Sequence, residues 1–239
     1  MTWSLLAYAP NQGTFGVAVT TCALAVGASC PFLRRGVGAV STQSITNRYL
    51  GPAVLDAMAR GLGPAAAIES ALAGDDGRHL RQIHALDVHG RSAAWTGRHC
   101  VEWCGELSGD GWSLAGNMLA GPEVLACTRD DFLAHGDASL AERMLTALQA
   151  GEAAGGDRRG RQSAALQVIT TEDFPDIDLR VDDHPAPLEE ISRLLGLWRR
   201  DREPMLKRSP SRANPSGSVD LDAMERGWVE RGLNLRFRR

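Results

Sequence analysis

The chain has 239 residues, 44% of them hydrophobic, which is enough to bury the core of one average to large domain. Its formal net charge of -3 and its pI near 6.1 give no electrostatic case for nucleic-acid binding. No apolar run approaches the ~20 residues that span a bilayer, and no charged segment followed by an apolar core marks a secretory signal. We therefore expect a cytoplasmic protein that binds neither nucleic acid nor membrane.

The types of reactive side chain narrow the chemistry. Of 26 basic residues only Lys207 is a lysine, and it lies near the C-terminus, so the folded domain has no P-loop, Schiff-base lysine or Ser–Lys dyad. Arginine stays protonated and can bind anions but cannot act as a general base. The five cysteines are an odd number in apolar segments, which is typical of reduced thiols. We expect no metal and no cofactor.

The residues that follow the initiator methionine predict a strand. Residues 2–8 are largely β-branched, aromatic or aliphatic, and a turn composition follows over residues 9–13. Methionine is normally trimmed before a side chain as small as that of threonine, and the catalytic interpretation of Thr2 requires that Met1 is removed. The α-amine and hydroxyl of Thr2 would then place a base and a nucleophile on one residue. The competing interpretation is that a Met-Thr start has no catalytic meaning.

The rest of the chain alternates blocks of strands with blocks of helices. This order, without a regular βαβ rhythm, favours a layered α+β architecture over a doubly wound sheet. Strands that are apolar on both faces fit a two-sheet core between helical layers. Strands are predicted over residues 2–8, 14–29, 36–44, 80–88, 91–96, 103–105 continuing to 111–119, 164–170 and 176–185, and helices over 51–60, 63–72, 122–134, 140–150 and 188–199.

Polar side chains at the ends of two predicted strands are candidates for a site. Gln43 and Asn47 close the strand over residues 36–44, where they fit either a pocket rim or ordinary turn chemistry. Asn117 stands between Gly116 and Met118 in an apolar run. It fits either an oxyanion donor or a left-handed turn beside glycine.

The densest polar stretch lies at residues 155–163, directly before a predicted strand. It holds Arg158, Arg159, Arg161 and Asp157 among glycines. Because a guanidinium matches a carboxylate or phosphate bidentately, these arginines predict an anion clamp, with Asp157 or Asp183 orienting them. The alternative is a solvated surface turn. Asp182, Asp183 and His184 also suggest a metal site, but consecutive strand residues alternate sides, so we favour pairing with the arginine loop.

Beyond residue 200 the composition changes to arginine, proline and serine. We therefore expect one domain over residues 1–200, followed by a polar linker and tail over residues 201–239. A short helix over residues 221–235 would carry Met224 and Trp228, which suit packing against a neighbouring subunit.

A set of motifs along the chain can be compared with known families: Met1-Thr2, 16–19, 36–40, Gln43, Asn47, 49–51, 96–97, 116–121, 151–163 and 179–184. Through these motifs the sequence resembles a bacterial family, the domain of unknown function 1028, placed in the N-terminal-nucleophile (Ntn) hydrolase superfamily. The resemblance covers roughly residues 2–198 and implies a four-layer αββα sandwich. It also implies that the first residue of the mature chain attacks an amide carbonyl while its own α-amine takes the proton.

These observations lead to an Ntn-type amidohydrolase of small anionic amides, with a homodimer as the expected oligomer. Thr2 would be the nucleophile, Asn117 and Gln43 would donate to the oxyanion, and Arg34 or Arg35 would supply the cation that a lysine supplies in proteasome-type members. Arg158, Arg159 and Arg161 would bind the substrate, with Asp157, Asn47 and Asp183. Ser4 is a reserve nucleophile. The alternatives are a non-catalytic protein that binds an anionic small molecule on the same fold, and an enzyme with metal at residues 182–184.

Overall fold

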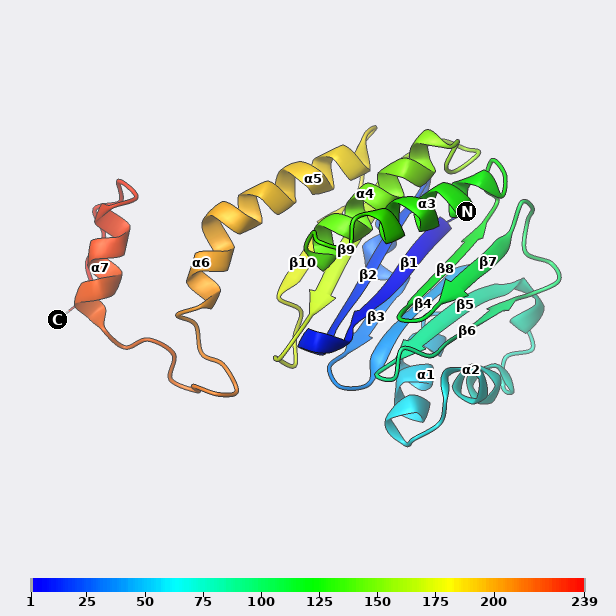
Figure 1. Ribbon diagram of the computed structural model, residues 1–239, viewed down its shortest axis with the longest axis horizontal. Coiled ribbons are helices and arrows are strands. Elements are labelled where there is room, and N and C mark those ends of the chain that lie inside the picture. Colours follow the sequence, from blue (N-terminus) through cyan, green and yellow to red (C-terminus); the bar gives the residue numbers. More distant parts are fainter. Residues whose placement is uncertain (1, 239) are drawn as a thin grey trace. The chain divides into compact units, whose positions relative to one another are not determined.

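The first strand, β1 (Thr2–Ala9), lies inside a six-stranded antiparallel sheet and pairs with a strand on each side. A second antiparallel sheet of four strands packs against it. In the computed structural model, which describes residues 2–238 (Figure 1), the six-stranded sheet has the order β10 (Ile177–Val181), β9 (Ser163–Ile169), β2 (Thr14–Thr21), β1, β8 (Trp112–Asn117) and β7 (Gly105–Gly109). The four-stranded sheet has the order β3 (Pro31–Arg34), β4 (Gly38–Ser44), β5 (Arg81–Asp87) and β6 (Ser92–Thr96).

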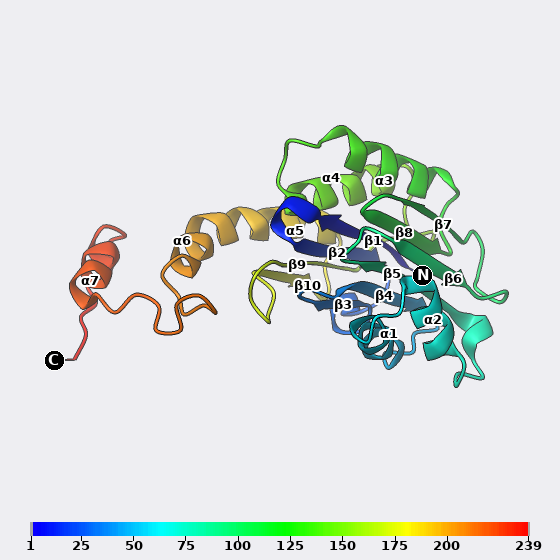
Figure 2. The same ribbon diagram turned by 60° about the horizontal axis from the view of Figure 1, so that its bottom comes forward.

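Each sheet carries a pair of helices on its outer face (Figure 2). Helices α3 (Glu123–Ala134) and α4 (Leu140–Ala153) cover the larger sheet, and α1 (Leu50–Ala59) and α2 (Pro64–Leu72) cover the smaller one. The expected mixed α+β architecture is confirmed, and the strand pairs of both sheets are antiparallel. Within residues 2–238, no helix is long and apolar enough to cross a membrane.

The strand β1 is buried on both faces, which explains its lack of polar alternation. Trp3 points to the side of α4, where glycine Cα atoms allow its indole to approach closely. Ser4 and Leu6 point to the other sheet. One end of the space between the sheets is apolar, around Leu6, Phe15 and Leu86. The other end is polar, and Thr2 lies there.

Two strand predictions need correction. The expected strand over residues 14–29 ends at Thr21, because Ser163 holds the following segment in a turn: its hydroxyl donates to Ala23 O (2.6 Å) and accepts from Val26 N (3.1 Å). The segment expected to run from residue 103 to 119 is a hairpin of β7 and β8. The half-exposed edge strand β7 has too little apolar content to be recognised as a separate strand.

The chain divides into two compact units, Met1–Gly196 and Leu197–Arg239. Helix α5 (Pro187–Leu197) closes the first. The second holds a π-helical turn (Trp198–Arg202), α6 (Glu203–Leu206) and α7 (Leu221–Val229). The residues expected to form a linker thus include a short helix, and the expected helix over residues 221–235 ends earlier.

We predict opposite effects of alanine at two helical glycines. A Cβ at Gly151 would meet Thr128 Oγ1, with Val124 O at 3.0 Å, so Gly151→Ala should lower the free energy of unfolding by about 1–3 kcal/mol. A Cβ at Gly196 meets nothing within 4 Å, so Gly196→Ala should raise it by about 0.5–1 kcal/mol. Chemical denaturation measures both. Equal shifts would show that helix propensity, rather than packing, controls Gly151.

Candidate functional site

Thr2 lies at the polar end of the space between the sheets, opposite Asn117 in the β1–β8 register. Its residue surface is 6% exposed, and its hydroxyl donates to Thr21 Oγ1 at 3.3 Å. Its carbonyl oxygen accepts from Gln43 Nε2 (3.3 Å) and Asn117 Nδ2 (3.4 Å). The structure therefore brings together the three residues that the sequence suggested for catalysis. Met1, whose removal the mechanism requires, lies outside the described residues.

Gln82, which the sequence did not single out, joins these groups. Its Oε1 accepts from Gln43 Nε2 (2.8 Å) and from Asn117 Nδ2 (3.0 Å). Its own Nε2 donates to the carbonyl of Gly116 at 2.8 Å. Because Gln43, Gln82 and Asn117 each donate to a backbone carbonyl, which can only accept, the orientation of all three amides is determined.

A buried histidine continues the same network. Ser4 Oγ donates to Gln43 Oε1 at 2.7 Å, so its single hydrogen is used and His84 Nε2 must donate to it (2.8 Å). His84 Nδ1 then accepts from Ser113 Oγ at 2.9 Å. Burial lowers the pKa of His84 to about 3, which agrees with this neutral tautomer. Ser4, the reserve nucleophile, is fully buried within this chain of bonds.

The amide orientation has a consequence for Asn117. Both of its side-chain hydrogens point to acceptors of the network, Thr2 O and Gln82 Oε1. Its Oδ1 is buried, with no hydrogen-bond partner among the described residues. In this arrangement the free polar atom of Asn117 is an acceptor. Donation to an oxyanion requires the amide to leave its long 3.4 Å bond to Thr2 O, the weaker of the two.

The loop that follows α4 reaches the same end of the large sheet through Asp157. This carboxylate is buried and accepts from Cys22 N (2.7 Å), next to Thr21, and from Arg159 N (2.8 Å). It also pairs with the guanidinium of Arg159 at 3.3 Å. A β-bridge between Asp157 and Leu119 ties the loop to the end of β8. Asp157 therefore orients Arg159, in the way that the sequence suggested.

The other two arginines of the loop point elsewhere. Arg158 NH1 donates to the carbonyl of Glu102 at 3.0 Å. Arg161 pairs with Glu152 (3.3 Å) and Glu189 (3.7 Å), on the helix-covered side of the sheet. Burial raises the pKa of Glu152. The three arginines thus diverge and do not form one cluster.

Asn47 belongs to a separate ionic group. It donates to Asp75 Oδ2 at 2.9 Å, and Asp75 also pairs with Arg81 at 2.9 Å. The hydrogen bond from Arg81 lowers the pKa of Asp75 to about 2. Asn47 nevertheless stays close to the end of β4, because its carbonyl accepts from Thr42 Oγ1 at 3.3 Å.

The acidic end of β10 bonds to other groups: Asp183 accepts from Gln162 at 3.1 Å and Asp182 pairs with Arg180 at 2.9 Å. His184 Nδ1 accepts from Ala186 N (3.0 Å). These three side chains have separate partners. Across residues 2–238 no group of three or more His, Cys, Asp or Glu side chains is arranged to hold a metal ion.

The two arginines expected to act as a nearby cation lie at the wrong end of their sheet. Arg34 pairs in register with Gly38, whereas Gln43, which touches Thr2, is at the opposite end of β4. Arg34 and Arg35 form ion pairs with Asp56 (2.8 Å) and Asp173 (3.3 Å). This expectation was wrong because sequence proximity to a strand does not determine which end of the strand faces the site.

Gln82 and His84 had a signal in the sequence. They are polar residues two apart in the interior of β5, where the other residues are apolar, so they point to one face of the strand. A polar pair on a face that must be buried indicates a buried hydrogen-bond network. Its partners on β1, β4 and β8 come from distant parts of the chain, and only the fold brings them together.

The chain belongs to DUF1028, a family of unknown function, whose model matches residues 2–191. It is similar to a crystal structure of protein SPO2555 from Silicibacter pomeroyi, described as DUF1028, with 29% identity, a TM-score of 0.85, and coverage of 92% of this chain and 96% of that chain. The chain matches no curated protein.

The chain also matches two further solved structures, Anbu (ancestral beta-subunit) from Yersinia bercovieri and Anbu from Hyphomicrobium sp. strain MC1. Each is 10% identical, with TM-scores of 0.38 and 0.37; the matches cover 87% and 85% of this chain and 98% of each of those chains. A likeness this slight carries no inference about function.

We predict that His84 makes stability depend on pH. Its folded pKa lies below its unfolded value, so stability is fully present above about pH 6.5 and falls as the unfolded state gains a proton on acidification. Between about pH 6 and about pH 4, the free energy of unfolding should fall more steeply in the wild type than in His84→Gln, by up to about 1.4 kcal/mol per pH unit.

Urea denaturation at several pH values measures this difference. The control is His99→Gln, at an exposed histidine, which should keep the wild-type slope. Parallel slopes for the wild type and His84→Gln would contradict a neutral, buried His84.

Proposed function

We propose that this protein is an Ntn-type amidohydrolase that cleaves an amide bond of a small anionic metabolite, with Thr2 as the nucleophile. The helix pairs and two sheets then correspond to the four-layer αββα sandwich of that superfamily. The observation that carries the proposal is the position of Thr2. It begins a strand flanked on both sides, at the polar end of the space between the sheets, with its carbonyl held by two side-chain amides.

The proposed reaction begins after removal of Met1, which frees the α-amine of Thr2. Thr2 Oγ1 attacks the substrate carbonyl carbon and its proton passes to the α-amine. The C–N bond breaks, the amine leaves with a proton, and a water molecule hydrolyses the resulting ester. Thr21, whose hydroxyl contacts Thr2 Oγ1, orients the nucleophile.

Charge that develops on the substrate oxygen needs a donor. Asn117 Nδ2 and Gln43 Nε2 are the side-chain donors beside Thr2, and their bonds to its carbonyl are long, at 3.4 and 3.3 Å. Such bonds exchange at lower cost than short ones. An amide turned from the Thr2 carbonyl to the oxyanion would gain a charge-assisted bond during the reaction.

For the substrate's anionic group we assign Arg159, with Asp157 as the residue that orients it. Asp157 connects directly to Cys22, which follows Thr21, so its arginine is the one tied most directly to the Thr2 end of the sheet. Arg159 keeps 43% of its side-chain surface exposed, so its guanidinium can also donate to a substrate carboxylate. Asn47 and Asp183 would contact the substrate farther from Thr2, at the rim of the site.

The nucleophile is tested with two substitutions. Thr2→Ala should lower kcat by at least about a thousandfold on any small amide acid that the wild type hydrolyses, whereas Thr2→Ser keeps a hydroxyl and should retain measurable turnover. Both keep a small second residue, so Met1 should be removed in each. Thermal melts check the fold. Full activity of Thr2→Ala would exclude this mechanism.

A non-catalytic protein that binds an anionic small molecule is the second candidate. Two observations favour it: Thr2 is almost fully buried, and Asn117 offers no free N–H in this arrangement. Intact-mass spectrometry of the purified protein separates the two candidates. Retention of Met1 leaves Thr2 without a free amine and favours binding, whereas its removal favours catalysis.

The anion clamp predicts a difference between two arginines of one loop. Arg159→Gln should raise KM, or the Kd for a bound carboxylate, by about tenfold, which is typical of losing a bond to a charged group. Arg161→Gln is the matched control, since Arg161 pairs with Glu152 and Glu189. Calorimetric titration with the same compound measures both. A larger effect at Arg161 would place the anion on the other side of the sheet.

A further inference from the structure

The C-terminal unit differs from the rest of the chain in charge. Residues 197–239 hold eleven basic and six acidic residues, whereas residues 1–196 hold fifteen basic and 23 acidic ones. The unit also lies beyond the family match, which ends at residue 191. A basic segment attached to an acidic body has an electrostatic reason to bind another acidic surface.

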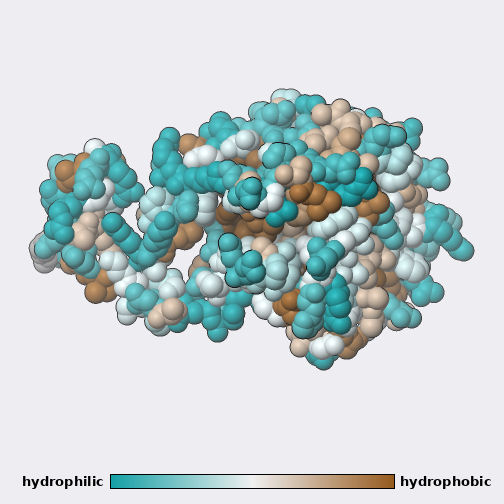
Figure 3. Space-filling model, in the orientation of Figure 1, coloured by the Kyte–Doolittle hydropathy of each residue, from teal (hydrophilic) through white to brown (hydrophobic). Residues whose placement is uncertain are grey.

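The unit also leaves apolar side chains uncovered. None of the residues of α6 or α7 is buried, although α7 is amphipathic. Val219 is 74% exposed, and Val229, Leu233 and Leu235 are about half exposed. Figure 3 shows hydrophobic residues on the surface of this unit among hydrophilic ones. An amphipathic helix with no fully buried residue is typical of a segment that packs on a partner.

A groove of about 590 Å³ runs through the unit. Met205, Met224 and Trp228 give it an apolar lining. Arg208 and Arg231 add positive charge against one lining acid, Glu230, while Arg200 is paired with Asp201 at 2.7 Å. Protein interfaces are enriched in aromatic residues, methionine and arginine, which are the residue types of this groove. The groove therefore suits an apolar side chain that is flanked by carboxylates.

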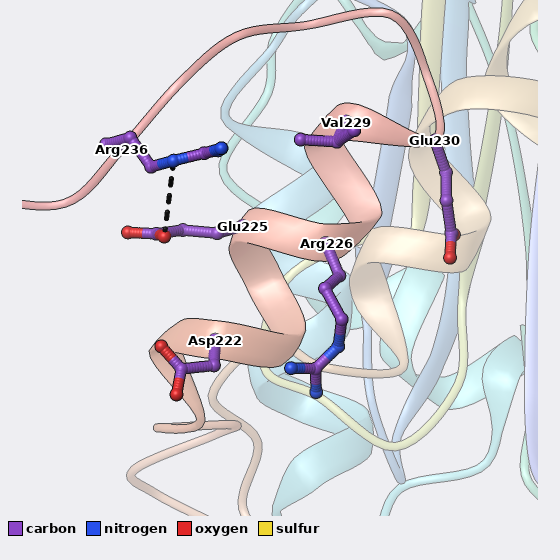
Figure 4. Close-up of a pocket in the computed structure, with 6 residues that line it drawn as sticks. All are labelled: Asp222, Glu225, Arg226, Val229, Glu230 and Arg236. Carbon is purple, nitrogen blue, oxygen red and sulfur yellow. Dashed lines mark ion pairs between the residues drawn. The ribbon is translucent and has the colours of Figure 1, made fainter.

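A second hollow on α7 has a different charge (Figure 4). Asp222, Glu225 and Glu230 line it with only two arginines, and one of these, Arg236, pairs with Glu225 at 3.7 Å. Val229 is its apolar side chain. This hollow has no excess of positive charge, so charge complementarity selects the methionine and tryptophan groove for an acidic partner.

The main unit carries a segment with the matching chemistry. The loop between β9 and β10 reads Thr-Glu-Asp-Phe-Pro-Asp over residues 171–176. Phe174 is 56% exposed, with Glu172, Asp173 and Asp176 around it in the sequence. Asp173 pairs with Arg35 at 3.3 Å but keeps 67% of its side-chain surface exposed. The adjoining strand β10 is at the edge of its sheet. An exposed aromatic residue among carboxylates is an anchor of the kind that the groove would hold.

We propose that the C-terminal unit docks on a second copy of this chain, with Phe174 of the one copy in the Met205–Met224–Trp228 groove of the other. Reciprocal exchange of the two contacts closes a two-fold dimer. Each chain supplies one acidic loop, residues 171–176, and one Met205–Met224–Trp228 groove. Two chains can therefore form two equivalent contacts. This inference is independent of the proposed hydrolase activity.

The experiment is a charge exchange between two variants. One carries Arg208→Glu with Arg231→Glu in the groove, and the other carries Glu172→Arg with Asp173→Arg in the loop. Light scattering after size exclusion should show a wild-type dimer and a monomer for each variant alone. An equimolar mixture should restore the dimer, because each groove then faces a loop of opposite charge.

The apolar contact is tested by Phe174→Ser, which should weaken dimerisation by about tenfold or more. The control is Leu133→Ser, at a 52% exposed leucine on the acidic helix α3, which should leave the dimer intact. A monomeric wild type at its highest soluble concentration would overturn the proposal. So would a dimer that survives Phe174→Ser and both charge-reversed variants.

Discussion

The side-chain amide of Gln82 is the group on which the arrangement of the site depends. Its oxygen accepts from Gln43 and Asn117, and its nitrogen donates to the carbonyl of Gly116, all in the interior between the sheets. A buried polar group that loses its partner costs about 1–3 kcal/mol, so each amide of the network constrains the next. The start of β1 is held by this constraint, because Gln43 and Asn117 both donate to the Thr2 carbonyl.

The same network divides the interior into two parts with different roles. Around Leu6, Phe15 and Leu86 the sheets meet through apolar contacts, which supply stability in proportion to buried area. Around Ser4 and His84 they meet through directed hydrogen bonds, which supply orientation, while burial keeps the imidazole neutral. A site at this end of the sandwich is therefore built on rigid strands, and its chemical groups have fixed donor and acceptor roles.

Membership of a family of unknown function leaves the chemistry to be argued from the residues themselves. Two parts of the molecule support two separate proposals. The Thr2 end of the main unit supports a reaction or a binding site, with Asp157 connecting the arginine loop to it. The C-terminal unit supports an interaction between copies, through its excess of arginine and its uncovered apolar residues. The two parts have no residue in common.

Local features of the sequence were sufficient for most of the elements. Ser139 and Glu142 form the capping box that starts α4, and glycine-containing turns separate β1 from β2 and β5 from β6, because caps and turns depend on residues close in the chain. The sequence also determined that Thr2, Gln43, Asn117 and the arginine loop were candidates. Tertiary structure alone decided that Gln82 joins the amides of Gln43 and Asn117, that Arg159 pairs with Asp157 whereas Arg161 pairs with Glu152, and that Arg34 lies at the far end of its sheet. The physical reason is that strand register and sheet pairing bring together residues that are tens of positions apart, and no local pattern records which end of a strand meets which partner.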